Sequence, residues 1–435
     1  MIRKKKDILR LALPAMVENM LQMLMGMVDN YLVAQISLVA VSGVSIANNI
    51  ITIYQAIFIA LGVAVSSLIA RSLGENNQLK PVKYMADAIM VTLGFSVVLG
   101  LISLFGQEAM LSFLGADAAV TAMGGSYLAV VGGMIVSLGL LTSLGAIIRA
   151  QGLARIPMRV SFFINLLNAL LSALSIYVFN LGILGVAWST VISRFVGVLL
   201  LASFLPLKAI WQEMGKGPID KAVFSLSLPA AGERLMMRAG DVLIIAIIVQ
   251  FGTKVLAGNA IGETLTQFNY MPGIAMSTAT VILVAGQLGS RQLQDMRETI
   301  RETFFLATLM MFVMAIASYL VGPTLIPLFT RDFQAHRASM IVLLFSLIGV
   351  PATAGTLIYT AVWQGMGKAQ FPFYATTVGM WFIRIIFGYI IGIVLGYGLA
   401  GVWLATVLDN SIRWFYLAYR FKKEYNSPLK SISDK

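Results

Sequence analysis

Residues 9–33 read LRLALPAMVENMLQMLMGMVDNYLV, a run long and apolar enough to cross a lipid bilayer as one helix. A hydrocarbon core about 30 Å thick needs about 20 residues at 1.5 Å per residue. The backbone must be helical there, because lipid offers its N–H and C=O groups no hydrogen-bond partner. The run is too long for a signal peptide and no small-residue cleavage site follows it, so we interpret it as a retained span.

Eleven further apolar runs of similar length follow along the chain. They lie at 45–70, 85–106, 122–149, 158–181, 185–207, 223–250, 257–287, 302–322, 338–364, 371–395 and 399–419. Twelve spans in 435 residues leave almost no chain for a soluble domain. The sequence therefore predicts an all-α polytopic membrane protein with twelve transmembrane helices.

The composition argues against several other classes of protein. Hydrophobic residues make up 59% of the chain and charged residues only 11%, whereas a soluble protein carries roughly 25% charge. Too few charges remain to cover the surface of a soluble enzyme or a nucleic-acid-binding protein. The chain has no cysteine and a single histidine, His336, so disulfides, thiol catalysis and metal sites built on these residues are not expected. We expect no enzyme activity, no metal and no cofactor.

The positive charges are distributed unevenly between the predicted loops. Of the 31 Lys and Arg residues, 23 lie on the side of the N-terminus, five lie within spans, and three, Lys254, Arg331 and Arg337, lie on the opposite side. Cytoplasmic loops carry the excess of Lys and Arg, so we expect both termini in the cytoplasm. The predicted location is the cell inner (cytoplasmic) membrane, which the chain crosses many times.

An internal repeat relates the two halves of the chain at an offset of 215 residues. The segment LALP at 11–14, followed by Glu18, matches LSLP at 226–229, followed by Glu233. We therefore predict two six-helix halves joined by a charged linker. Their boundaries are 1–208 for the N-terminal bundle, 209–221 for the cytoplasmic linker, and 222–435 for the C-terminal bundle with its cytoplasmic tail.

The even number of spans in each half determines how the halves are related. Each half begins and ends on the same side of the membrane, so a pseudo-twofold axis along the membrane normal relates them. Parallel repeats of this kind are typical of transporters whose halves rock about a substrate site. We predict two bundles around a central cavity.

The first span carries polar residues on one face. Glu18, Gln22 and Asp29 fall on a narrow stripe of a helix with 3.6 residues per turn. A charge at the bilayer centre costs about 2.5–3.5 kcal/mol, so this stripe needs a reason. We predict that Glu18 and Gln22 line the cavity and that Asp29 binds a coupling ion; the alternative is an Asp29 that only caps a neighbouring group. Pro14 and Gly26 can bend the helix and are predicted as its hinge.

The second span and its repeat partner, the eighth, carry matching polar stripes. The matched positions are Asn48, Thr52 and Gln55 in the second span and Glu263, Gln267 and Tyr270 in the eighth. Both stripes are predicted to face the cavity; hydrogen bonding between helices without substrate contact is the alternative. Tyr359 and Trp363 join the predicted cavity wall, because Trp and Tyr ring faces attract organic cations.

The seventh and twelfth spans contain closely spaced charges of opposite sign. Arg238 and Asp241 are spaced i, i+3, and Asp409 and Arg413 are spaced i, i+4. Such pairs either neutralise each other and determine packing, or they take part in ion binding. Glu233 has no partner on its own helix face, so we expect it to pair across helices.

Several short motifs follow one another along the whole chain. They are Pro14 with Val28-Asp29, Leu73-Gly74, Gln151-Gly152 through Pro157, Gly185 to Thr190, Pro229, Tyr270-Met271-Pro272-Gly273, Gln287-Leu288-Gly289, and Gly365 to Pro372. In this order, and with the internal repeat, the chain resembles the multidrug and toxic compound extrusion (MATE) transporters. The resemblance implies an antiporter that exports cationic amphipathic compounds by alternating access in exchange for Na⁺ or H⁺.

The resemblance also implies an ion site in the N-terminal half. Members of the family bind the cation with an acidic residue of span one, polar and acidic residues of span five and a threonine of span six. The matching residues here are Asp29, Asn168 and Thr190. Ser172 stands where a second carboxylate is usual, which leaves Asp29 as the only carboxylate of this site.

Some members of the family instead use carboxylates of spans seven and ten. Span ten of this chain has none, so the C-terminal alternative depends on Glu233, Asp241 and Glu263.

A lipid-linked oligosaccharide flippase of related architecture is the alternative function. Four arginines within spans favour it: Arg194, Arg234, Arg238 and Arg384. Arg194 and Arg384 are otherwise expected to serve as counter-ions or to extend toward the membrane surface. The expected partners are small organic cations and membrane lipid, with no nucleic acid, and the expected oligomeric state is a monomer.

Overall fold

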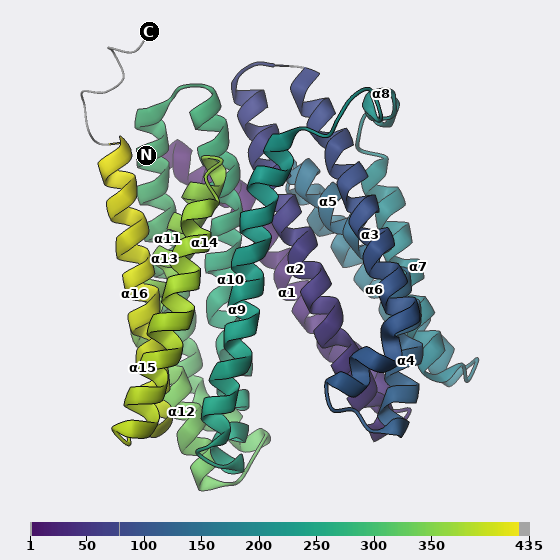
Figure 1. Ribbon diagram of the computed structural model, residues 1–435, viewed down its shortest axis with the longest axis vertical. Coiled ribbons are helices and arrows are strands. Elements are labelled where there is room, and N and C mark those ends of the chain that lie inside the picture. The colour runs from purple at the N-terminus through teal and green to yellow at the C-terminus, as the bar shows by residue number, and fades with distance from the viewer. Residues whose placement is uncertain (1, 78, 426–435) are drawn as a thin grey trace. The chain divides into compact units, whose positions relative to one another are not determined.

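The computed structural model describes residues 2–77 and 79–425, and every regular element in these ranges is a helix (Figure 1). The elements of the first half are α1 (Ile2–Ala34), α2 (Leu38–Gly74), α3 (Leu79–Phe113), α4 (Ala118–Gly133), α5 (Val136–Ala150), α6 (Arg155–Tyr177), α7 (Gly182–Ala202) and the short α8 (Leu207–Glu213). The prediction of an all-α protein is confirmed.

The second half begins with three long helices and ends with another. Its elements are α9 (Lys221–Val249), α10 (Thr253–Gly289), α11 (Leu293–Leu325), α12 (Phe333–Ile348), α13 (Val350–Gly365), α14 (Gln370–Val378), α15 (Ile386–Tyr389) and α16 (Gly398–Tyr425). A 3₁₀ turn at Ile326–Leu328 follows α11, and π-helical segments at Gly379–Ile385 and Ile390–Val394 flank α15. The eleventh predicted span is therefore a helix with two wide turns.

Ten of the twelve predicted spans in the described residues are long and apolar enough to cross a membrane. Eight are single helices, and the bent pairs α4–α5 and α12–α13 add two more. Helices α9 and α16 occupy the two remaining predicted positions but do not meet the same criterion. The reason is that both helices carry charged side chains, several of which belong to a polar network inside the second half.

Two predicted spans are broken helices where the sequence had indicated continuous ones. The axis bends by 45° between α4 and α5 and by 58° between α12 and α13. Pro351 lies in the first turn of α13, just after Gly349. Proline lacks an N–H group and its ring collides with the preceding turn of a helix, so α12 ends at Ile348.

Hydroxyl and carboxylate side chains cap several helix starts. Ser37 accepts a hydrogen bond from the backbone N–H of Ala40, and Asp117 caps α4 in the same way through Val120. Such caps satisfy N–H groups that have no partner inside the helix. Asp332 caps α12 in a predicted loop, where the hydrogen bond from Lys254 holds its pKa below the usual value.

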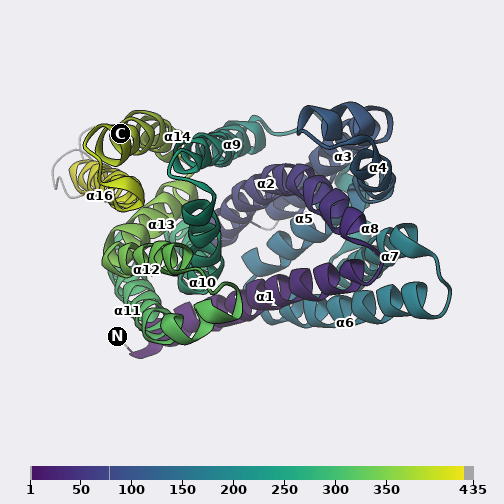
Figure 2. The same ribbon diagram turned by 90° about the horizontal axis from the view of Figure 1, so that it is seen from below.

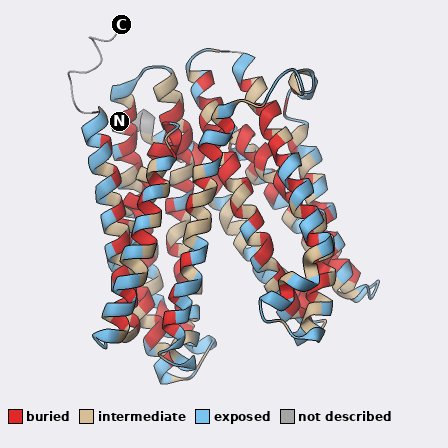
Figure 3. Ribbon diagram, viewed as in Figure 1, coloured by how far each residue is buried: buried red, intermediate tan, exposed pale blue. Residues whose placement is uncertain are grey.

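The contacts divide the chain into two compact units, each with its own apolar core. The first unit contains Leu13–Ala231 and Leu288–Arg291; the second contains Gly232–Gln287 and the helices that follow Gln292, with the start of α1. Buried and exposed positions alternate along the same helices in both units (Figure 3). The exposed positions include many large apolar side chains, as expected of helices that contact lipid.

The predicted linker is partly helical and packs on the first unit. It contains the last part of α8, and after this helix the backbone N–H of Asp220 donates to the buried Asp87 carboxylate at 3.0 Å. Val223 at the start of α9 is fully buried in the apolar cluster of α3 and α5. The division of the chain by contacts falls after Ala231, within α9, and the predicted boundary at residue 222 stays a prediction.

Two glycines allow α2 and α4 to approach closely. A Cβ added at Gly43 would lie 2.7 Å from the backbone nitrogen of Gly124, and one at Gly124 would lie 2.7 Å from the carbonyl oxygen of Gly43. Small residues at such a crossing are a common way to pack membrane helices, because van der Waals contact replaces the hydrophobic effect there.

We expect Gly43→Ala to destabilise the first unit by about 1–3 kcal/mol, because the new methyl group collides with backbone that has no rotamer to change. Thermal unfolding in detergent micelles measures the effect. Gly94→Ala is the control, since a Cβ at Gly94 in α3 meets nothing within 4 Å. Equal unfolding temperatures for the two variants would contradict the close crossing.

Candidate functional site

Asp29 forms a hydrogen-bonded chain with α6 in the first unit. Helices α6 and α7 pack along each other, and α1 runs beside them (Figure 2). Asn168 donates from Nδ2 to Oδ2 of Asp29 at 3.3 Å, and Ser172 donates from Oγ to Oδ1 of Asn168 at 3.2 Å. Asn168 and Ser172 are one turn apart on α6, which places both on the face toward α1. Three residues of the predicted N-terminal ion site are thus brought together.

Helix α7 adds a hydroxyl and a guanidinium to the same region. Thr190 is buried; its hydroxyl donates to the carbonyl of Val186, and its side chain also bonds Tyr127 of α4. Arg194 lies one turn further along α7 and interacts electrostatically with Asp29 and Tyr127. This electrostatic interaction supports a counter-ion role for Arg194, which stays a prediction.

Two polar atoms of this region have no hydrogen-bond partner among the described residues. They are Oδ1 of Asp29 and Nη1 of Arg194, and both are shielded from solvent. Buried polar atoms are normally paired, so each unpaired atom needs an explanation. Asp29 therefore has one oxygen engaged by an amide and one oxygen free.

Glu18 is already paired with an arginine. Both of its carboxylate oxygens accept hydrogen bonds from Nη1 of Arg149, at 2.9 and 3.1 Å. Arg149 lies in the last turn of α5. The sequence had indicated Glu18 as part of the cavity wall; its side chain forms a partly buried ion pair between α1 and α5. Helix α1 continues through Pro14 and Gly26, so their role as a hinge remains a prediction.

Glu233 is buried in the second unit and pairs across helices, as predicted. Its carboxylate accepts hydrogen bonds from Nε2 of Gln364 on α13, at 3.1 Å, and from Oγ1 of Thr376 on α14, at 3.3 Å. The Thr376 hydroxyl in turn accepts from Nη1 of Arg413 on α16, at 3.2 Å. One carboxylate therefore joins α13 and α14 to α9, and the Thr376 hydroxyl extends the network to α16.

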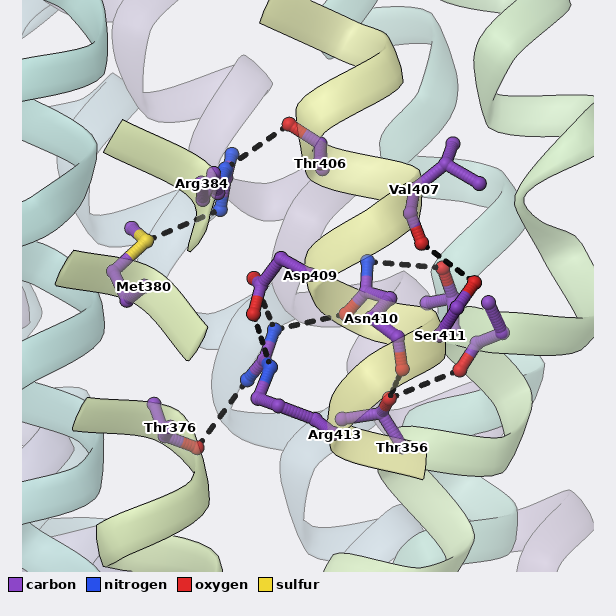
Figure 4. A network of polar contacts seen from close by, with 12 residues as sticks. Thr356, Thr376, Met380, Arg384, Thr406, Val407, Asp409, Asn410, Ser411 and Arg413 are labelled. Atoms are coloured by element: carbon purple, nitrogen blue, oxygen red, sulfur yellow. Dashed lines mark hydrogen bonds and ion pairs between the residues drawn. The ribbon is translucent and has the colours of Figure 1, made fainter. Parts of the chain in front are cut away.

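Arg413 continues this network to Asp409 (Figure 4). Nη2 of Arg413 donates to Oδ2 of Asp409 at 2.9 Å and to Oδ1 of Asn410 at 2.8 Å. Asp409 has no exposed surface and Arg413 is 5% exposed. The predicted pair of the twelfth span is confirmed as a buried ion pair, and its polarity accounts for the low apolarity of α16.

Asp241 pairs with a different arginine from the one predicted. Its Oδ1 lies 3.4 Å from Nη1 of Arg384, whereas Arg238 on its own helix is exposed. Arg384 lies on the π-helical segment after α14 and also donates to the Thr406 hydroxyl at 3.1 Å (Figure 4). The expected Arg238–Asp241 pair is replaced because the wide π turn carries Arg384 toward α9 and α16. Arg384 is thus a counter-ion.

The predicted cavity residues differ in their surroundings. Trp363 is fully buried, donates to the carbonyl of Leu417 and packs against Phe371 and Phe421, so it belongs to the core and not to a cavity wall. Tyr359 lines a separate pocket between α11, α13 and α16. The polar positions on α1, α2 and α10 keep part of their surface exposed: Gln22, Asn48, Thr52, Gln55, Glu263, Gln267 and Tyr270. Their contact with substrate remains a prediction.

Two side-chain contacts recur in both units at the offset of the sequence repeat. Arg149 bonds Glu18 and Gln364 bonds Glu233, each pair being separated by 131 residues. Ser103 donates to Tyr54, and Ser318 donates to Asn269, each pair being separated by 49 residues. The repeat thus extends to individual side-chain contacts. Arg149 and Gln364 occupy matching positions at this offset. The sequence analysis did not single out either residue, and the repeat is the signal that could have found them.

The family model MatE matches the chain twice, at residues 14–174 and at residues 229–390. The two matches correspond to the two halves of the internal repeat. The chain belongs to the MATE family of transporters.

Proteins of known sequence and structure agree over nearly the full length. An uncharacterized transporter, YisQ, of Bacillus subtilis is 24% identical, covering 96% of this chain and 94% of its own. A probable multidrug resistance protein, NorM, of Thermotoga maritima is 26% identical, covering 96% and 93%. A MATE crystal structure in the bent conformation has a TM-score of 0.90 at 20% identity and covers 97% and 96% of the two chains. A transporter of the MOP superfamily from Pyrococcus furiosus, described as having a binding pocket of reverse polarity, has a TM-score of 0.87 at 20% identity, with the same coverage.

Arg413→Gln is expected to lower the free energy of unfolding by about 3–5 kcal/mol, because it leaves the Asp409 carboxylate buried without a counter-charge. Thermal unfolding in detergent micelles measures the loss. The double variant D409N/R413Q removes both charges and should recover much of the stability. A double variant less stable than R413Q would contradict the explanation that the R413Q variant loses stability through the uncompensated charge of Asp409.

Proposed function

We propose that the protein is a cation-coupled multidrug antiporter that exports organic cationic amphipathic compounds by alternating access. It acts in the inner (cytoplasmic) membrane with both termini in the cytoplasm, as a monomer, without a cofactor and without nucleic acid. The relatives named as probable multidrug resistance proteins support multidrug export. The observation that carries the proposal is the Asp29 carboxylate, which keeps one free oxygen in a shielded site.

Asp29 is suited to couple an ion to movement because it links α1 to α6. Its Oδ2 holds Asn168, while its Oδ1 is available to a cation or a proton. A ligand shifts a conformational equilibrium only if it binds the two states with different affinities. Occupation of Asp29 would change the charge opposite Asn168 and Arg194, and α1 would then rearrange about Pro14 and Gly26.

Between the two candidate ions, the geometry favours a proton. Hard cations are held by several oxygen ligands at once. Asn168 turns its amide nitrogen toward Asp29, and its oxygen is bonded to Ser172. Arg194 adds a fixed positive charge that repels a second cation. One free carboxylate oxygen is enough for H⁺ and poor for Na⁺.

The carboxylates of the second unit are the alternative carriers. Glu233 is engaged by two donors, Asp241 by Arg384, and Glu263 by Asn259. Asp29 also has a partner, Asn168, but its Oδ1 is shielded and has no hydrogen-bond partner among the described residues, which makes Asp29 the stronger candidate. Glu263 is the next to test, because it faces only an amide at close range.

A flippase for a lipid-linked oligosaccharide is the second candidate function. The observation that favours it is the exposed Arg238 on α9, which suits an anionic group better than an organic cation. The similarity in fold to a transporter described as having reverse polarity is compatible with this alternative.

Efflux of ethidium from proteoliposomes, with Na⁺ and pH gradients imposed separately, tests the proposal. We expect a pH gradient to drive efflux and a Na⁺ gradient at equal pH to have no effect. Asp29→Asn should reduce driven efflux at least about tenfold, the factor that corresponds to a coupling free energy of 1.4 kcal/mol. Glu108→Gln, which changes an exposed carboxylate of α3, is the matched control.

The other outcomes separate the alternatives. Efflux driven by Na⁺ alone would contradict the proton as the coupling ion. Full pH-driven efflux by Asp29→Asn would move the ion site to the second unit and make Glu263→Gln the next variant. Absence of ethidium efflux under both gradients would favour the flippase.

A further inference from the structure

A pocket of about 500 Å³ lies between α11, α13 and α16 of the second unit, away from the Glu233 network. Cations and aromatic rings make up most of its lining, which contains no acidic residue. The lining includes Arg297, Arg301, Phe304, Phe415, Tyr419 and Lys422. Neither the ion sites nor the predicted cavity accounts for this combination of side chains.

The pocket lies at the end of the second unit where the segments predicted to be cytoplasmic meet. Lys5 at the start of α1 forms an ion pair with Glu302 of α11 at 3.4 Å. Arg297 donates to the backbone carbonyl of Tyr425, and Lys368 pairs with Glu424, which joins α11 and the α13–α14 loop to the last turn of α16. These contacts place the pocket at the predicted cytoplasmic membrane surface.

The positive charge of the pocket is not neutralised by its neighbours. Among the described residues, neither Arg301 nor Lys422 has a carboxylate within ion-pair distance, and both side chains are exposed. Two nearby acidic residues are paired with lysines: Glu302 with Lys5 and Glu424 with Lys368. An anion that enters the pocket therefore meets up to three cations without displacing an existing ion pair.

The walls of the pocket are aromatic and open to the membrane. Phe415 is 62% exposed and Tyr419 is 67% exposed, while Phe304 is held in place by stacking on Trp414 at 5.2 Å between ring centroids. Aromatic side chains at this depth lie beside lipid headgroups and the first part of their acyl chains. A soluble anion would use the cations and leave these rings uncovered; a lipid uses both.

We propose that this pocket binds one anionic phospholipid of the cytoplasmic leaflet. The phosphate contacts Arg297, Arg301 and Lys422, and an acyl chain covers Phe304, Phe415 and Tyr419. Basic pockets between membrane helices on the cytoplasmic side recognise anionic headgroups by the same combination of charge and apolar contact. The bound lipid would link α11 to α16. This site does not depend on which carboxylate carries the coupling ion.

Native mass spectrometry of the full-length protein in mild detergent, titrated with phosphatidylglycerol, tests the site. We expect one tightly bound phosphatidylglycerol and no comparable binding of phosphatidylcholine. R301Q/K422Q should weaken that binding roughly 10- to 30-fold, as expected for two contacts of Lys or Arg with an anionic headgroup. The charge-conserving variant R301K/K422R should retain it.

The control R155Q/R159Q removes two exposed arginines from the start of α6, so its net charge equals that of R301Q/K422Q. It should bind phosphatidylglycerol as the wild type does. An equal loss in both variants would overturn the proposal in favour of a general surface charge. Displacement of the lipid by excess soluble glycerol phosphate would overturn it in favour of a site for free phosphate.

Discussion

A carboxylate inside a membrane helix requires a compensating charge or hydrogen-bond donors, because the hydrocarbon around it offers neither. The structure meets this requirement at four carboxylates within the described spans. Glu18 has Arg149, Asp409 has Arg413, Asp241 has Arg384, and Glu233 has an amide and a hydroxyl. The pairings of Glu18, Asp241 and Glu233 join different helices, whereas Asp409 and Arg413 lie one turn apart on α16. Oδ1 of Asp29 has no hydrogen-bond partner among the described residues, and its interaction with Arg194 is electrostatic; Oδ1 of Asp409, by contrast, lies 2.9 Å from Nε of Arg413.

The two units are built on one plan, with different polar groups at matching places. The contact between Glu18 and Arg149 is an ion pair, whereas its counterpart between Glu233 and Gln364 is a charge held by an amide. Arg384 and Thr406 are separated by 22 residues, like Asn168 and Thr190. The second unit therefore carries a guanidinium where the first carries the amide that holds Asp29. This substitution gives a physical reason to place the ion in the first unit.

Much of the fold and part of the site could be predicted from the sequence. The apolar runs, the repeat and the i, i+4 pair Asp409–Arg413 depend on local spacing, so the sequence contains all that is needed to find them. Trp363 and Arg238 show the limit of prediction from the sequence. An aromatic side chain in a span can face lipid, core or cavity, and an arginine can reach partners on several helices. Which of these it does depends on helices that are distant in sequence.

By itself, the sequence determined that the chain is helical and membrane-spanning, that it is duplicated, and which few carboxylates must be accommodated inside it. The physical reason is that the bilayer imposes length, apolarity and backbone hydrogen bonding on each span separately. Only the tertiary structure decided the partners of those carboxylates and the bend between α4 and α5. It also decided that Arg301 and Lys422 lie beside Phe304 and Tyr419 in one pocket. Such choices follow from packing between segments far apart in the chain, where a wide turn or a missing side chain changes which groups can meet.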